Sequence, residues 1–85
     1  MKQFSYVLTN DLAKQSRPIG HLMKEAAKFS SRISLIHNEK SAPLAQMRDV
    51  LALDMKSGNL VTVLVEGRDE EDALAAMQNY FVANM

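Results

Sequence analysis

The sequence predicts a two-layer α+β domain, in which helices cover one face of a β-sheet. Two observations predict this class. Segments with period-two apolar alternation are interleaved with segments of helical periodicity, in the order β-α-β-β-α-β-α. Two of the expected strands are separated only by the turn residues 38–40, so these strands pair antiparallel. Eighty-five residues are enough for one small domain, which we expect to span residues 1–85.

The first two elements are expected to be a strand and a helix. Residues 2–9 place apolar side chains on one parity, which is typical of a half-buried strand. A helix is expected from Ser16, a good N-cap residue, with Pro18 in its first turn. Its apolar face has residues three and four apart and continues to Ser30-Ser31, which stop it. The apolar positions are Phe4, Tyr6 and Leu8 in the strand and Ile19, Leu22, Met23, Ala26 and Phe29 in the helix.

A hairpin is expected next. Its first strand, residues 32–37, points Ile33 and Leu35 inward. The second strand is short and lies around Ser41-Ala42. Pro43 cannot donate a ladder hydrogen bond, so it limits this strand and predicts a position at the sheet edge.

A short helix over residues 45–53, a strand over residues 60–66 and a final helix complete the chain. The strand is rich in β-branched residues and ends at Gly67. The final helix begins in the acidic run 69–72, where the helix dipole favours carboxylates. The apolar positions are Met47, Val50, Leu51 and Leu53 in the short helix, Val61, Val63 and Val65 in the strand, and Ala73, Leu74, Met77 and Phe81 in the final helix.

Composition excludes several classes of function. Ten basic residues balance ten acidic ones, so no overall field attracts nucleic acid or an anionic membrane, and neither is an expected partner. The chain has no cysteine, which excludes disulfides and thiol chemistry. No spacing of the two histidines with a carboxylate predicts a metal site, and no cofactor is expected. No apolar run is long enough for a membrane span or a signal peptide, so we expect a cytoplasmic domain.

Four groups of residues, in register along the whole chain, carry a family resemblance. They are Arg17-Pro18, Lys24-Glu25-Ala26 followed by Phe29, Asn38-x-Lys40-Ser41-Ala42, and Val61-Thr62-Val63 leading to Glu66-Gly67-x-Asp69-Glu70. Together they make the sequence similar to the HPr family, the histidine-containing phosphocarriers of the bacterial sugar phosphotransferase system. The resemblance implies an open-faced β-sandwich, with four antiparallel strands in the order 1-4-2-3 and three helices on one face.

The resemblance also implies a phosphoacceptor position, at which this chain departs from the family. The family motif reads Gly-Leu-His-x-Arg-Pro, and its histidine accepts phosphate from phosphorylated Enzyme I. Here Gln15 stands at the position of the histidine, and Ala13-Lys14 replace the Gly-Leu pair. An imidazole nitrogen is a good nucleophile near neutral pH, whereas a carboxamide nitrogen is delocalised and not basic. We therefore expect no phosphorelay through Gln15.

A second family switch is a serine at the start of the short helix, which a dedicated kinase phosphorylates in Gram-positive members. Here that position is Gln46, which has no hydroxyl. A branch of the family, the catabolite-repression HPr, also has glutamine at the first site but keeps the serine. This chain resembles that branch at Gln15 and departs from it at Gln46. With both acceptors absent we expect no catalytic residue and no enzyme activity.

The resemblance implies a docking surface formed by the start of the first helix and by the short helix. In relatives an apolar patch rimmed by lysines contacts acidic clefts on partner proteins, whereas here Asp49, Ala27 and Ala45 change that rim. The expected partners are proteins of the sugar phosphotransferase system or a regulatory protein or enzyme. The candidate partner-binding residues are Gln15, Ser16, Arg17, Gly20, Lys24, Gln46, Met47, Arg48 and Leu51.

Less specific interpretations stay open. Ser16-Arg17-Pro18 can be only a helix cap and first turn, and Met47 and Leu51 can be incompletely covered core. His21 lies off the apolar stripe and is expected at the surface, which leaves it as a substitute phosphoacceptor in an alternative phosphocarrier function. His37 is expected to be an ordinary surface residue beside a turn. In a third interpretation the domain binds no HPr partner at all.

Overall fold

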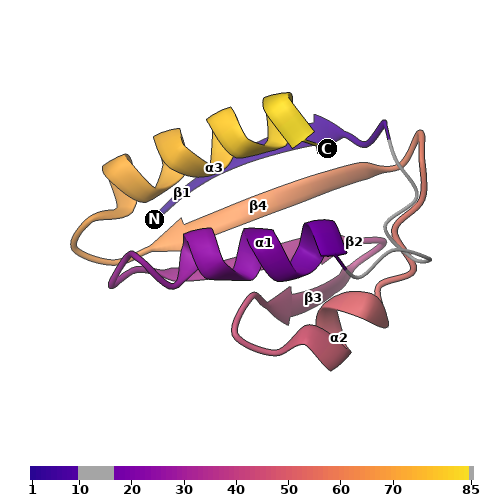
Figure 1. Cartoon of the computed structure of the whole chain (residues 1–85), viewed down its shortest axis with the longest axis horizontal. Coiled ribbons are helices and arrows are strands. Elements are labelled where there is room, and N and C mark those ends of the chain that lie inside the picture. The colour runs from indigo at the N-terminus through magenta and orange to yellow at the C-terminus, as the bar shows by residue number, and fades with distance from the viewer. Residues whose placement is uncertain (10–16, 85) are drawn as a thin grey trace.

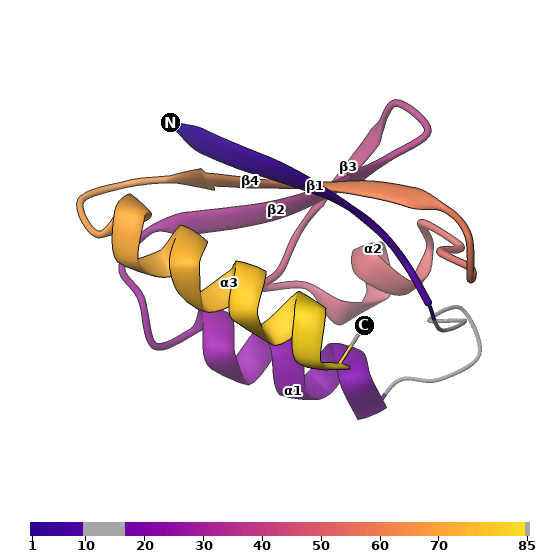
Figure 2. The ribbon, with the colours of Figure 1, turned by 90° about the horizontal axis from the view of Figure 1, so that it is seen from above.

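The computed structural model describes residues 1–9 and 17–84 and confirms the predicted element order. A four-stranded antiparallel sheet has the strand order β1-β4-β2-β3. The three helices of the described residues all lie on one face of this sheet (Figures 1 and 2). The elements are β1 (Lys2–Val7), α1 (Arg17–Ala26), β2 (Arg32–His37), β3 (Lys40–Pro43), α2 (Met47–Leu51), β4 (Leu60–Glu66) and α3 (Glu70–Asn84).

The core lies between the sheet and the helices, because every strand has alternate residues on opposite faces. The inward residues of the central strands β2 and β4 are buried, as the apolar alternation of residues 32–37 and 60–66 predicted. Phe81 of α3 packs edge-on against Phe4 and Tyr6 of β1, with ring centroids 5.6 and 5.7 Å apart. The largest fully buried side chains are Phe81, Leu8, Ile19, Leu22, Leu35, Met55, Met77, Val50, Val61 and Val63.

The edges of the sheet are β1 on one side and β3 on the other. The short β3 ends at Pro43, and its place at the edge confirms the prediction from proline. The outer face of the sheet is uncovered by any described helix (Figure 2). There Leu60 is 58 % exposed, opposite Val7 in the register of β1 and β4.

Three element boundaries differ from the predicted ones. β1 ends at Val7 and α2 is limited to Met47–Leu51. α1 ends at Ala26 instead of at Ser30, because the next residues tighten into a turn in which Phe29 N–H donates to the carbonyl of Ala26, 3.2 Å away. Phe29 remains half-buried against the core, so the apolar stripe continues past the end of the helix. The predicted cap Ser16 lies outside the described residues.

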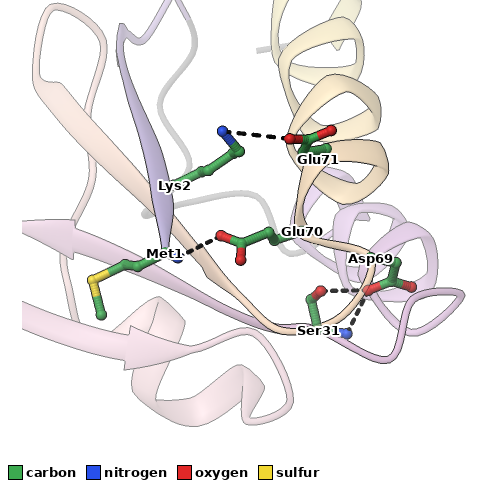
Figure 3. Close-up of polar contacts among 6 residues, drawn as sticks. All are labelled: Met1, Lys2, Ser31, Asp69, Glu70 and Glu71. Atoms are coloured by element: carbon green, nitrogen blue, oxygen red, sulfur yellow. Dashed lines mark hydrogen bonds and ion pairs between the residues drawn. The ribbon is translucent and has the colours of Figure 1, made fainter.

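The first turn of α3 is fixed by polar contacts to β1 and to the start of β2 (Figure 3). The half-buried Asp69 carboxylate accepts hydrogen bonds from the backbone N–H groups of Ser30 and Ser31, each 2.9 Å long, and from the Ser31 hydroxyl. On the other side, the Met1 nitrogen lies 2.5 Å from a carboxylate oxygen of Glu70. These contacts hold three distant segments at one corner of the sandwich.

The hydrogen bonds to Asp69 also change its ionisation. The Ser31 hydroxyl, and then the Ser30 amide, hold the pKa of Asp69 below its ordinary value of 3.8, because they stabilise the charged carboxylate. Close beside it, Gly67 has φ +152°, and a Cβ there would lie 2.6 Å from the Ser31 Cα. The sharp approach of this turn to Ser31 therefore requires glycine.

Candidate functional site

The candidate docking face consists of α1 and α2, and α1 presents its polar side to solvent. Ile19 and Leu22 are fully buried and anchor the helix on the sheet. Lys24 and His21 are exposed, and Gly20 is half-buried. The exposure of His21 confirms its expected place off the apolar stripe.

α2 is short and is anchored by Val50, which is fully buried. It follows Gln46, whose backbone is extended, with φ −127° and ψ 100°, and whose side chain makes no capping hydrogen bond. Gln46, Arg48 and Asp49 are exposed, whereas Leu51 is half-buried and packs against the core. Leu51 therefore contributes to the core and to the surface at once.

α1 and α2 contact each other on the helical side of the sheet (Figure 1). The exposed charged residues Lys24, Arg48 and Asp49 thus lie on two helices that cover the same face of the sheet. Arg17 and Met47 are the first residues of α1 and α2. The predicted residues Gln15 and Ser16 lie outside the described residues. The two helices of the predicted docking surface are thus neighbours.

An apolar hollow of about 230 Å³ opens beside the docking face, between the second half of α1, β2 and the end of β3. Ala27 and Ala45, the two positions at which the sequence lacks the expected charge, lie at this hollow and are exposed. Small side chains at both positions leave room for an apolar group of a partner. The lining residues are Met23, Ala26, Ala27, Phe29, Ser31, Arg32, Ile33, Pro43, Leu44 and Ala45.

The prediction that His37 is an ordinary surface residue is wrong. His37 is only 8 % exposed, and its Nδ1–H donates to the carbonyl oxygen of Leu53 over 2.8 Å. The ring shares the inward parity of Ile33 and Leu35, which is the sequence signal that pointed to burial. By bonding to Leu53, His37 ties β2 to the segment that follows α2 and so helps to position that helix.

The described side chains of this face offer a partner charged groups and apolar contact. Within residues 1–9 and 17–84, no cluster of histidine and carboxylate side chains could hold a metal ion. In the same described ranges, no helix has the length and apolar character of a membrane span. The two histidines differ in their accessibility to solvent. His21 is exposed, whereas His37 is buried and hydrogen-bonded.

Comparison with known proteins gives one consistent result. A family model described as "PTS HPr component phosphorylation site" matches residues 2–83. Phosphocarrier protein HPr of Mycoplasma capricolum is 35 % identical over 82 residues, covering 96 % of this chain and 92 % of that protein.

Solved structures are equally similar. The histidine-containing phosphocarrier protein of a mycoplasma matches with a TM-score of 0.88 and 34 % identity, covering 96 % of this chain and 93 % of the other. HPr-C-His from Thermoanaerobacter tengcongensis matches with a TM-score of 0.89 and 28 % identity, covering 98 % and 93 %. The four-stranded sandwich with helices on one face is thus the fold of these proteins.

Proposed function

This chain belongs to the HPr family of the phosphotransferase system, and from that premise we propose that it is a regulatory docking module that does not carry phosphate. The observation that carries the proposal is the pair of glutamines at the family's two phosphorylation positions, Gln15 and Gln46. Neither carboxamide has a basic nitrogen or a hydroxyl, so neither can form the phosphoramidate or the phosphate ester.

The docking function is supported by the parts of the partner surface that the chain keeps. Lys24 and Arg48 are exposed on the neighbouring helices α1 and α2, where they can meet carboxylates of a partner. The apolar hollow beside them offers contact area without charge. The exposed carboxylate of Asp49 would be repelled by a strongly acidic cleft. The preferred partner surface is therefore acidic only at its rim and apolar at its centre.

The partners in this proposal are proteins of the sugar phosphotransferase system, or a regulatory protein or enzyme that such proteins control. They share the cytoplasm with the domain. Arg17, at the start of α1, acts as an anchor that pairs with a partner carboxylate or with a phosphate that the partner carries.

A phosphocarrier with a non-standard acceptor is the second candidate function. The observation that favours it is the exposure of His21 on α1, since an exposed imidazole is accessible to a phosphorylated donor. His37 is a poorer candidate, because it is buried and its Nδ1–H is donated to Leu53.

Partner capture tests the docking function. The protein is immobilised, cytosol of the source organism is passed over it, and retained proteins are identified by mass spectrometry. Arg48→Glu and Ala45→Glu should abolish retention of a phosphotransferase-system or regulatory protein, because they reverse a charge and place a carboxylate at the hollow. Arg17→Ala should weaken binding by roughly 1–3 kcal/mol, the range for losing charge-assisted hydrogen bonds.

Leu60→Glu is the matched control, since Leu60 is 58 % exposed and its alternation with the buried Val61 puts it on the face of the sheet opposite the helices. It should capture partners as well as the parent chain does. Circular dichroism confirms that each variant is folded. The proposal would be contradicted if Leu60→Glu lost its partners while Arg48→Glu and Ala45→Glu still captured them. The binding surface would then lie on the open face of the sheet and not on the helices.

A further inference from the structure

The outer edge of β1 is an open sheet edge. Within the described residues β1 pairs only with β4, from Lys2 opposite Val65 to Val7 opposite Leu60. Leu8 N–H continues this ladder and donates to the carbonyl of Asn59, 2.9 Å away.

Backbone groups alternate in direction along a strand, so the ladder fixes the direction of each one. Leu8, just after β1, and the even-numbered residues of β1 therefore direct their N–H and C=O groups toward β4. Those of Gln3, Ser5 and Val7 point away from the sheet, as the row of donors and acceptors that an edge strand offers to another strand.

A groove runs beside this edge, between β1 and α3. Its volume is about 350 Å³, and it is lined by Phe4, Ser5, Tyr6, Gln78, Asn79 and Val82. Phe4 and Tyr6 point to the inner face of the sheet, yet they remain only half-buried because no further strand covers them. Val82, on the outer side of α3, is 73 % exposed. Apolar area is thus left open on the strand and on the helix together.

The charges around this groove indicate which partner it fits. The sequence contains no charged side chain from Ala73 to Met85, which includes all but the first turn of α3. The one charged residue of β1, Lys2, lies at its far end, 3.8 Å from the carboxylate of Glu71 in the same chain (Figure 3). A charged partner would find no charged side chain of opposite sign on this surface. A second copy of the same surface, in contrast, would meet no like-charge repulsion.

We propose that the β1 edge and the exposed side of α3 form the interface of a symmetric homodimer. In this dimer the β1 strands of two copies pair antiparallel, and the two sheets become one continuous sheet. A two-fold axis perpendicular to the sheet passes midway between the two Ser5 residues, so that outward-pointing residues face each other, and the Lys2 residues lie at opposite ends of the new strand pair.

The same pairing brings the helices into contact. Each α3 contacts both β1 and β4 of its own chain, so it lies above those two strands. With neighbouring strands about 4.8 Å apart, the axes of the two α3 helices come to lie roughly 10 Å from each other, within the range of packed helices. The acidic first turns lie far apart, because antiparallel helices of 15 residues place them about 22 Å from each other. One partner thus covers both the open strand edge and the apolar helix face.

The test measures the molecular mass of the whole chain by analytical ultracentrifugation. Samples run from about 1 µM to about 1 mM, which covers the dissociation constants of weak and moderate interfaces. Wild type should pass from monomer to dimer over this series. Hydrogen exchange should show protection of the Gln3, Ser5 and Val7 amides that rises with the dimer fraction, whereas those of Phe4 and Tyr6 stay protected at every concentration.

Two variants probe the strand edge and the helix face separately. Ser5→Pro removes an outward N–H without removing a bond to β4, and Ser5→Ala is its control, because both lose the hydroxyl contact with Thr62. Val82→Lys places like charges on the facing helices. Ser5→Pro and Val82→Lys should each raise the dimer dissociation constant by about tenfold or more, whereas Ser5→Ala should behave as wild type.

Leu60→Lys distinguishes this interface from stacking of the exposed sheet faces. Leu60 lies on the outer face of β4, one strand inward from the edge, and should tolerate the charge. A mass that stays monomeric throughout the series would overturn the proposal. So would a dimer that Leu60→Lys breaks and Val82→Lys leaves intact.

Discussion

The side chain of Gln46 occupies the position at which Gram-positive relatives are expected to carry a phosphorylatable serine. Its backbone is extended and its carbonyl accepts a hydrogen bond from Val50 N–H, 3.2 Å away, so it is the N-cap of α2 in geometry. The carboxamide nevertheless makes no capping bond. A serine here would supply both a cap and a hydroxyl.

We therefore expect the serine kinase of the HPr system to leave the wild-type chain unmodified. Gln46→Ser should accept one phosphoryl group, which the helix N-terminus tolerates because of its dipole. Intact-mass spectrometry after incubation with kinase and ATP measures both outcomes. A phosphoryl group on the wild-type chain would contradict the assignment of Gln46 as the inert position.

His37 provides a second prediction from a single side chain. In His37→Leu the carbonyl of Leu53 loses its donor in a buried place, so the free energy of unfolding should fall by about 1–3 kcal/mol. His21→Leu, at an exposed position on α1, should change it by about 0.5 kcal/mol or less. Urea unfolding of both variants measures the difference. Equal stabilities would show that the bond to Leu53 contributes nothing.

Among the elements, the start of α3 depends most on contacts from distant parts of the chain. Asp69 accepts hydrogen bonds from the amides of Ser30 and Ser31, so these amides are not available to extend α1. The sequence around the end of α1 continues its apolar stripe to Phe29, but the amides of Lys28 and Phe29 bond three residues back, so the helix ends at Ala26 and the two serines continue as a segment held by Asp69. The bond between Ser30 and a carboxylate 39 positions away cannot be predicted from local periodicity.

The depressed pKa of Asp69 predicts an acid-sensitive contribution to stability. A carboxyl whose pKa is lowered by folding stabilises the native state above its unfolded value, 3.8, and that contribution is lost as the pH falls through the lower native value. Asp69→Asn should therefore be less stable than wild type at pH 7, and the difference should shrink below pH 3.8.

Urea unfolding at neutral and acidic pH measures this difference. Asp72→Asn is the matched control, because Asp72 is exposed in the first turn of the same helix. At pH 7 it should lose less stability than Asp69→Asn, because Asp72 accepts none of the hydrogen bonds that the Ser30 and Ser31 amides donate to Asp69. The prediction would be contradicted if the stability difference between wild type and Asp69→Asn increased on acidification.

For the whole molecule, the fold could be predicted because its strand parities and helix stripes agree with one another. The alternating valines at 61, 63 and 65 are fully buried, and Pro43 ends an edge strand, as local chemistry requires. The strand order came from the resemblance to HPr proteins and is confirmed by the structure.

The site could be predicted only in outline. Lys24, Arg48 and Leu51 were placed on the two expected helices, which the structure brings into contact. The hollow at Ala27 and Ala45 was not predicted, because it forms where three elements distant in sequence meet. The missed burial of His37 has the same origin, since its partner Leu53 lies 16 residues further along the chain.

The central claim, an HPr fold that docks without carrying phosphate, is tested most directly by incubating the protein with Enzyme I and phosphoenolpyruvate. Intact-mass spectrometry at alkaline pH, where a phosphoramidate survives, should show the unmodified chain, with a conventional HPr in the same mixture fully phosphorylated. Acid-labile phosphate on the chain, at His21 or elsewhere, would contradict the account and make the protein a phosphocarrier.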